Sequence, residues 1–214
     1  MHKKSILLFI AFFLCSFICF AQNWDINLLK QINVNRYHSL DSFFKIITDY
    51  AAPIAYSVPF LLLLFAIIKK RKILKAKSIY IIQSAITALI ISTLIKHIVN
   101  RPRPYVTYSF IEKITGGSSP SFPSGHTSDA FTLAASLSFA FPKWYIIIPS
   151  YVWAAAVGYS RMDLGVHYPS DVLASIIIGI FSAFVCYELK ERREKKAIES
   201  DINIMYNQPR KKKE

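Results

Sequence analysis

Glycine and cysteine are scarce in this chain of 214 residues, and their scarcity excludes several classes of site. With six glycines and no glycine-rich loop, the sequence has no nucleotide-binding fingerprint. The three cysteines, Cys15, Cys19 and Cys186, all fall inside apolar runs. Cys15 and Cys19 are one helical turn apart, but no histidine or further cysteine lies near enough to complete a metal site. We therefore expect neither a zinc site nor a disulfide framework.

Acidic residues are also few. The sequence has 13 Asp and Glu against 26 Lys and Arg, which gives a formal net charge of +13. Such a charge could indicate nucleic-acid binding. However, the basic residues form blocks between and after the apolar runs, a pattern typical of membrane topology and of contact with anionic lipid headgroups. We therefore expect a bilayer with anionic lipids as a partner, and no nucleic acid.

Long apolar runs are abundant. The chain is 53% hydrophobic with a mean hydropathy of +0.34, and its apolar residues follow one another instead of recurring at helical or strand spacing. This pattern indicates a bilayer. The length predicts one domain. We divide the chain into an N-terminal segment (1–21), a membrane domain (22–189) and a basic cytoplasmic tail (190–214), which its charge predicts to be poorly ordered.

The N-terminal segment has two interpretations. Basic residues at positions 2–4 precede an apolar stretch from Ile6 to Phe20, which stops at Ala21-Gln22. This resembles a signal peptide cut after Ala21. The alternative is an uncleaved first membrane span. In both cases residue 22 begins on the outer face.

The segment 23–50 mixes polar residues with apolar residues at helical spacing. It predicts two short amphipathic helices on the outer membrane surface, broken around residues 33–35. A soluble linker is the alternative interpretation.

Five apolar runs of near-spanning or spanning length follow, so the predicted fold class is all-α: a polytopic membrane helical bundle with five spans, or six if the N-terminal segment also spans. The runs cover residues 53–68, 78–95, 126–141, 144–159 and 171–189. Six Lys or Arg in 69–77 mark the cytoplasmic side. The tail falls on that side too, whereas loops 96–122 and 160–170 fall on the opposite, outer side.

The outer ends of the spans carry three clusters of reactive side chains. In the first, Lys96 ends a span and Arg103-Pro104 follows after six residues, with Arg101-Pro102 between them. The X-Pro pairs force an extended path that can turn Lys96 and Arg103 toward one point. Two cations held together favour an anion between them. The alternative is the usual basic flank of a helix, although such flanks favour the cytoplasmic side.

The second cluster is Pro123-Ser124-Gly125-His126, directly before a span. Ser124 can cap the helix, and Gly125 lets a ligand approach the backbone. The free N–H groups of a helix start form an anion site, with His126 at its rim. A surface histidine is the alternative for His126 alone.

The third cluster is the stretch 160–171, which packs Arg161, His167 and Asp171 between two apolar segments. Pro169-Ser170 predicts the start of the last helix, with Asp171 in its first turn and His167 one turn earlier. A histidine oriented by a carboxylate is a candidate base or nucleophile, and an arginine suits phosphate. The alternative is a juxtamembrane loop whose charges face water.

Together these clusters place two histidines, a carboxylate, three cations and a helix start on one face. They contain no group of carboxylates, so we expect no metal and no cofactor. Such a set suits phosphoryl transfer: cations and N–H groups bind the equatorial oxygens, one histidine attacks in line, and the other protonates the leaving oxygen.

In order and spacing, the three clusters resemble the signature of the type 2 phosphatidic acid phosphatase superfamily, which includes bacterial lipid phosphatases, acid phosphatases and vanadium haloperoxidases. The resemblance implies that His167 is the nucleophile, Asp171 orients it and His126 is the general acid. It also implies a set of phosphate-binding residues: Lys96, Arg103, Arg161, Ser124 and Gly125.

The remaining polar residues of the signature region receive no catalytic role. Arg101 occupies a free position of the first motif, and Asp163 occupies a free position of the third. We interpret Asp163 as a solvated loop residue and Ser160 as a structural residue of the loop.

The resemblance implies a metal-independent phosphatase of the bacterial inner membrane, with its site facing the periplasm or exterior. Its substrate would be a lipid phosphate or diphosphate of the undecaprenyl diphosphate, phosphatidylglycerol phosphate, phosphatidic acid or lipid A type. Two alternatives are a vanadium-dependent haloperoxidase, which the membrane setting disfavours, and a non-catalytic lipid-binding protein, which would not need both histidines and the aspartate.

Overall fold

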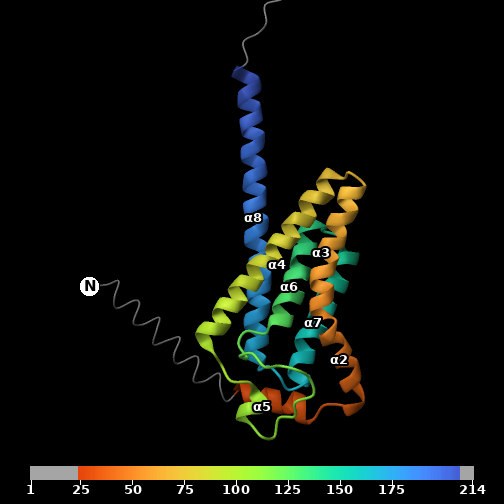
Figure 1. The fold of residues 1–214 in the computed structure, drawn as a ribbon, viewed down its shortest axis with the longest axis vertical. Coiled ribbons are helices and arrows are strands. Elements are labelled where there is room, and N and C mark those ends of the chain that lie inside the picture. Colours follow the sequence, from red (N-terminus) through yellow and green to blue (C-terminus); the bar gives the residue numbers. More distant parts are fainter. Residues whose placement is uncertain (1–23, 208–214) are drawn as a thin grey trace, which may run out of the picture.

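A computed structural model describes residues 24–207, which form helices and no strands (Figure 1). The predicted all-α class is therefore confirmed. The segment 1–21, interpreted as a signal peptide or a first span, lies outside the described residues.

Five long helices occupy the five predicted apolar runs. They are α3 (Ala51–Ile68), α4 (Lys72–Val99), α6 (Gly125–Ala140), α7 (Trp144–Asp163) and α8 (Pro169–Asn207). Among the described residues, three helical segments are long and apolar enough to cross a membrane: His38–Ile68, Lys72–Thr107 and Pro169–Ser200. The existence of the five helices is confirmed, and the count of five spans stays a prediction.

Helix α6 lies among the other long helices and buries several small polar side chains. It packs against α3, α4, α7 and α8. Its buried face carries Ser128, Thr132 and Ser136, and Ser128 Oγ accepts a hydrogen bond from Ser92 of α4 at 3.1 Å. On α8, a Cβ at Gly179 would lie 2.9 Å from the Ser128 carbonyl oxygen. Small residues allow such close approach between membrane helices.

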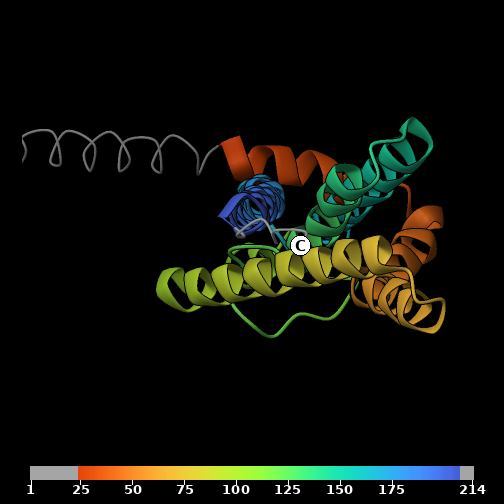
Figure 2. The ribbon, with the colours of Figure 1, turned by 90° about the horizontal axis from the view of Figure 1, so that it is seen from above.

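The segment before α3 forms two short helices, as predicted. Residues 24–34 are helical, and after a three-residue link come η1 (His38–Leu40) and α2 (Asp41–Asp49). Figure 2 looks along α8 and shows the helix 24–34, in red, lying across the bundle instead of along it. This is the orientation expected of a helix at a membrane surface.

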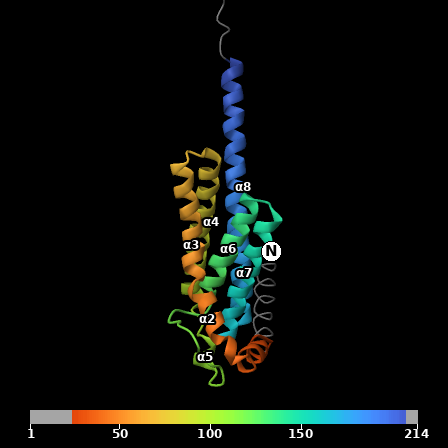
Figure 3. The same cartoon turned by 90° about the vertical axis from the view of Figure 1, so that its right-hand side faces the viewer.

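The two ends of the bundle differ in charge and in structure. The basic link between α3 and α4 lies at one end, toward which the far part of α8 also extends (Figures 1 and 3). The opposite end carries helix 24–34, α2 and the short helix α5 (Pro104–Thr107). The clusters identified in the sequence are at this second end, which agrees with the predicted topology.

The prediction of a poorly ordered tail is wrong for residues 190–207, since α8 continues to Asn207. Acidic and basic side chains alternate here at helical spacing. Lys190 Nζ lies 3.0 Å from Glu194 Oε1, and Arg192 Nε lies 3.9 Å from Glu188 Oε2, both pairs one turn apart. Such pairs, together with residues of high helix propensity, stabilise a helix whose side chains are mostly exposed.

Candidate active site

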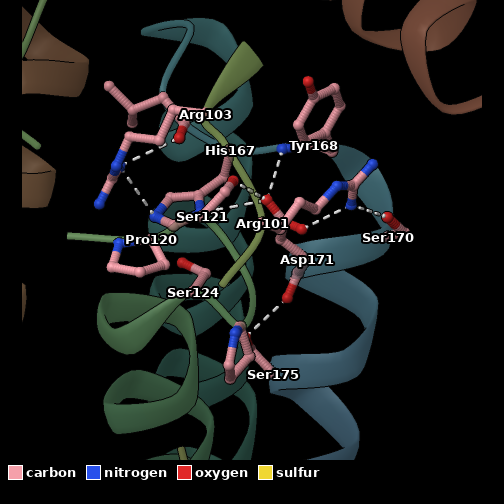
Figure 4. Close-up of polar contacts among 12 residues, drawn as sticks. Arg101, Arg103, Pro120, Ser121, Ser124, His167, Tyr168, Ser170, Asp171 and Ser175 are labelled. Carbon is pink, nitrogen blue, oxygen red and sulfur yellow. Dashed lines mark hydrogen bonds and ion pairs between the residues drawn. The ribbon is translucent and has the colours of Figure 1, made fainter. Parts of the chain in front are cut away.

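His167 and Asp171 meet at the start of α8. The helix begins at Pro169 and has Asp171 in its first turn, as predicted. His167 Nδ1 lies 3.4 Å from Asp171 Oδ2, and both side chains are at most 1% exposed (Figure 4). A carboxylate at Nδ1 favours the proton on that nitrogen, which leaves the lone pair on Nε2.

The loop between α7 and α8 is held by backbone bonds. The Arg161 carbonyl accepts hydrogen bonds from the N–H groups of Val166 (3.1 Å) and His167 (3.2 Å). The turn requires a positive φ of 72° at Gly165, where a methyl group would overlap the Glu112 carbonyl oxygen. The path of this loop fixes the place of His167.

Replacing Gly165 with alanine is expected to destabilise the fold by at least ~2 kcal/mol. The new Cβ would overlap the Glu112 carbonyl oxygen, and the left-handed backbone conformation is itself strained for a residue with a Cβ. Thermal unfolding in detergent would measure this as a lower midpoint. Gly116→Ala is the matched control, since nothing lies within 4 Å of a Cβ there. Equal midpoints for the two variants would contradict this account of the loop.

Lys96 and Arg103 both reach the loop before α6. Lys96, in the last turn of α4, donates from Nζ to the carbonyl oxygens of Pro120 and Pro123, each at 2.8 Å. Arg103 donates from Nε to the Ser119 carbonyl at 2.8 Å, and its Nη1 lies 3.4 Å from His167 Nε2. Arg103 therefore approaches the histidine from the side of its free lone pair, and Lys96 binds the same loop.

Helix α6 begins where it was predicted to begin, but the Ser124 hydroxyl does not cap it. Ser124 is the N-cap and Gly125 is the first helical residue, but the Ser124 hydroxyl bonds Thr127 Oγ1 at 2.9 Å and no backbone N–H. The first N–H groups of α6 are thus left without a side-chain cap, as an anion site requires. The Ser124 N–H lies 3.5 Å from the Asp171 carbonyl oxygen, so the starts of α6 and α8 are adjacent.

Arg161 is a buried cation, and one of its hydrogen-bond donors has no partner among the described residues. Its side chain lies in the last turn of α7, is 2% exposed, and donates from Nη1 to the Thr48 hydroxyl of α2. Its Nε has no hydrogen-bond partner among the described residues. A buried, unpaired guanidinium N–H is costly unless an acceptor such as a phosphate oxygen meets it.

Electrostatics links these groups into one site. The half-buried His126 interacts with the charges of Lys96, Arg103 and Arg161. Burial is the main cause that lowers the pKa of His167 to about 3; Asp171 acts against this shift, and Arg161 and Arg103 add to it. The His167 imidazole is therefore neutral near pH 7, as a nucleophile must be. The structure brings all three predicted clusters together.

Of two expectations about nearby polar residues, the one for Asp163 needs correction and the one for Ser160 does not. Asp163, predicted to be solvated, is 3% exposed. The prediction is wrong because α7 continues to Asp163 and helix 24–34 covers it, with Asn33 Nδ2 donating to the Asp163 carbonyl oxygen at 2.8 Å. Ser160 is buried, and its hydroxyl bonds the Val157 carbonyl, which fits the structural role predicted for it.

Arg101, to which the sequence assigned no role, touches the predicted catalytic carboxylate. Its Nη1 donates to Asp171 Oδ1 at 2.7 Å (Figure 4). The Ser121 hydroxyl and the Tyr168 N–H donate to the other oxygen, Oδ2. In the sequence Arg-Pro-Arg-Pro, no feature distinguishes Arg101 from Arg103. The sequence therefore does not predict which of the two contacts Asp171.

Comparison with known proteins gives consistent results. Residues 77–195 match the family model of the PAP2 superfamily. The chain is 33% identical over 172 residues to undecaprenyl-diphosphatase BcrC of Bacillus subtilis, an alignment that covers 79% of this chain and 84% of that protein.

Solved structures agree in fold. The crystal structure of Aquifex aeolicus LpxE has a TM-score of 0.65 and 30% identity, covering 77% of this chain and 95% of that one. A transmembrane PAP2 type phosphatidylglycerolphosphate phosphatase from Bacillus subtilis has a TM-score of 0.68, covers 90% of this chain and 98% of that one, and is 24% identical. The second likeness bears on the fold alone.

Proposed function

The chain belongs to the PAP2 superfamily, and from this premise we propose that it removes phosphate from a lipid phosphate or diphosphate through a phosphohistidine intermediate. The observation that carries the proposal is the meeting of His167 with Asp171 on one side and Arg103 on the other. The histidine is oriented and neutral, and its free nitrogen faces Arg103.

Phosphate binding is assigned to groups from four parts of the chain. Lys96 and Arg103 come from α4 and the segment after it, Arg161 from the end of α7, and the N–H groups of Gly125 and its neighbours from the start of α6. Fixed cations and helix-start N–H groups stabilise the charge that develops on the equatorial oxygens. Ser124 shapes this helix start.

In the first step, His167 Nε2 attacks phosphorus and the P–O bond to the lipid breaks. The bonding electrons go to the leaving oxygen, which takes a proton from His126. The resulting phosphohistidine is an imidazolium, and its Nδ1–H faces the Asp171 carboxylate, which stabilises the positive charge.

In the second step, His126 takes a proton from a water molecule as that water attacks phosphorus. The P–N bond breaks, its electrons return to His167, and inorganic phosphate is released. His126 is then protonated and His167 is neutral, as both were before the first step. One group thus serves as acid and then as base, as in other two-step hydrolyses.

The position of the site suits a lipid substrate. The cations lie at the end of the bundle that carries helix 24–34 and α2, so a headgroup at the membrane surface can reach them while its chains stay in the bilayer (Figure 1). The basic blocks lie toward the other end, and we assign that end to the cytoplasm and the site to the periplasmic or outer face of the bacterial inner membrane.

Phosphate release from a panel of lipids by the purified protein in detergent tests this proposal. The panel holds a polyprenyl diphosphate, phosphatidylglycerol phosphate, phosphatidic acid and lipid A. We expect the polyprenyl diphosphate to react fastest, because the undecaprenyl-diphosphatase of Bacillus subtilis matches most of both chains. The water-soluble headgroup of each lipid is the matched control.

Two outcomes would contradict the proposal. Binding of these lipids without hydrolysis of any of them would favour a lipid-binding protein. Halide oxidation after addition of vanadate, without phosphate release from lipids, would favour a haloperoxidase.

A further inference from the structure

Arg101 bridges two buried carboxylates. Its Nη1 donates to Asp171 Oδ1 at 2.7 Å, and its Nη2 donates to Asp25 Oδ2 at 2.8 Å. The guanidinium lies over the Tyr168 ring, 3.7 Å from the ring centre to Cζ. The planar fork is thus fixed on one face by an aromatic ring and at both ends by carboxylates, which limits its freedom to rotate.

Asp25 ties this bridge to the start of α8. Its Oδ1 accepts the Ser170 N–H at 2.8 Å, and the Ser170 hydroxyl also bonds to Asp25 and lies 2.7 Å from Arg101 Nη1. Asp25 is 1% exposed, although it belongs to helix 24–34 at the outer end of the bundle. A carboxylate from a distant segment therefore caps the helix that carries Asp171.

We propose that Arg101 and Asp25 form a clamp that positions the Asp171 carboxylate against His167. Among the described residues, Arg101 is the hydrogen-bond donor to Asp171 Oδ1, while Oδ2 receives Ser121, the Tyr168 N–H and His167. Holding Oδ1 fixes the plane of the carboxylate, so Oδ2 stays directed at His167 Nδ1. Arg101 and Asp25 are positioning residues, because they act on His167 through Asp171.

Charge explains why two carboxylates are needed. Arg101 paired with Asp171 alone would be neutral and would offer little to a cation. With Asp25 included, the three groups carry a net charge of −1, which opposes the positive charge that His167 acquires when it bonds phosphorus. The clamp therefore keeps the catalytic carboxylate oriented without cancelling its charge.

The inference rests on the proposed function, and a double-mutant test addresses it. Arg101→Ala should lower kcat by about 10- to 100-fold, the usual cost of losing a group that orients a catalytic residue. KM and competitive inhibition by inorganic phosphate should change less than about twofold, because in this account Arg101 does not touch phosphate. Arg101→Lys should restore part of kcat, and Asp25→Asn should show a smaller loss in kcat alone.

The same substitutions are then made in Asp171→Asn protein. If the clamp acts only through Asp171, they should cause no further loss there, since groups that act as a unit are not additive. Arg36→Ala is the matched control: this buried arginine also joins two carboxylates, Asp41 of α2 and Glu112 of the loop after α5. Its effect on kcat should be small and should be the same in both backgrounds.

Losses that multiply in the Asp171→Asn background, or a raised KM with weaker inhibition by inorganic phosphate, would overturn the clamp. If Arg101→Ala does not fold, Asp25→Asn makes the same comparison, because it keeps the shape of the residue and an acceptor for the Ser170 N–H. Wild-type protein that releases no phosphate from any lipid would overturn the proposed function itself. Active wild-type protein with additive losses would overturn the clamp alone.

Discussion

Replacing His167 with alanine is expected to lower phosphate release on the order of 10⁴-fold or more, as the loss of a nucleophile does in other enzymes with covalent intermediates. The protein should still fold and insert, because Asp171 keeps its bonds to Arg101, Ser121 and the Tyr168 N–H. The buried carboxylate is thus not left unpaired.

The measurement has two parts. Steady-state release from the preferred lipid gives the loss in rate. Rapid acid-free quenching with a phosphorus-labelled substrate should show a label on wild-type protein that is stable to base and labile to acid, and no label on the variant. His97→Ala is the matched control, since His97 is exposed in the last turn of α4, one residue after Lys96. Turnover or labelling of the His167 variant would refute the nucleophile assignment.

Replacing His126 with alanine is expected to slow turnover of lipid monophosphates by about 10²- to 10⁴-fold, the usual contribution of a general acid and base. The two steps should respond differently to the leaving group. An alkoxide needs a proton to leave, whereas nitrophenolate does not. With p-nitrophenyl phosphate the first step should therefore stay fast, while the attack of water stays slow because no base assists it.

The expected signature is a burst of nitrophenolate, equal to about one per enzyme, followed by slow turnover and accumulation of phosphorylated protein. Wild-type protein should hold much less phosphorylated enzyme at steady state, because His126 assists the attack of water on it. His38→Ala, a substitution of an exposed histidine at the same end of the bundle, is the control. Equal losses for lipid and nitrophenyl substrates, without a burst, would show that His126 acts in binding and not in proton transfer.

The sequence predicted those parts of the molecule that repeat a simple physical pattern. Long apolar runs determined the five helices, and Pro169 marked the start of α8 correctly. Spacing alone placed Asp171 one turn after His167, because a helix start fixes where its first residues point. The segment 24–49 was also predicted as two helices from apolar spacing.

The rest depended on contacts between distant segments. Ser121 meets Asp171, and Asp25 meets Arg101, only after the chain has folded, and neither Ser121 nor Asp25 stands in a motif. The prediction for Asp163 failed because it assigned the residue to a loop that faces water, whereas α7 continues to Asp163 and Asn33 covers it. In the tail, the high charge predicts disorder, whereas the spacing of opposite charges at one helical turn favours a helix.

Two cations of the site, Lys96 and Arg103, already have protein acceptors. Lys96 donates two of its three ammonium hydrogens to the carbonyls of Pro120 and Pro123, and Arg103 donates to the carbonyls of Ser119 and Val166. An arriving phosphate group therefore exchanges one set of acceptors for another, and an exchange gains much less free energy than a new bond. We therefore expect free inorganic phosphate, which has no lipid chains to anchor it, to bind weakly and to dissociate readily from the site.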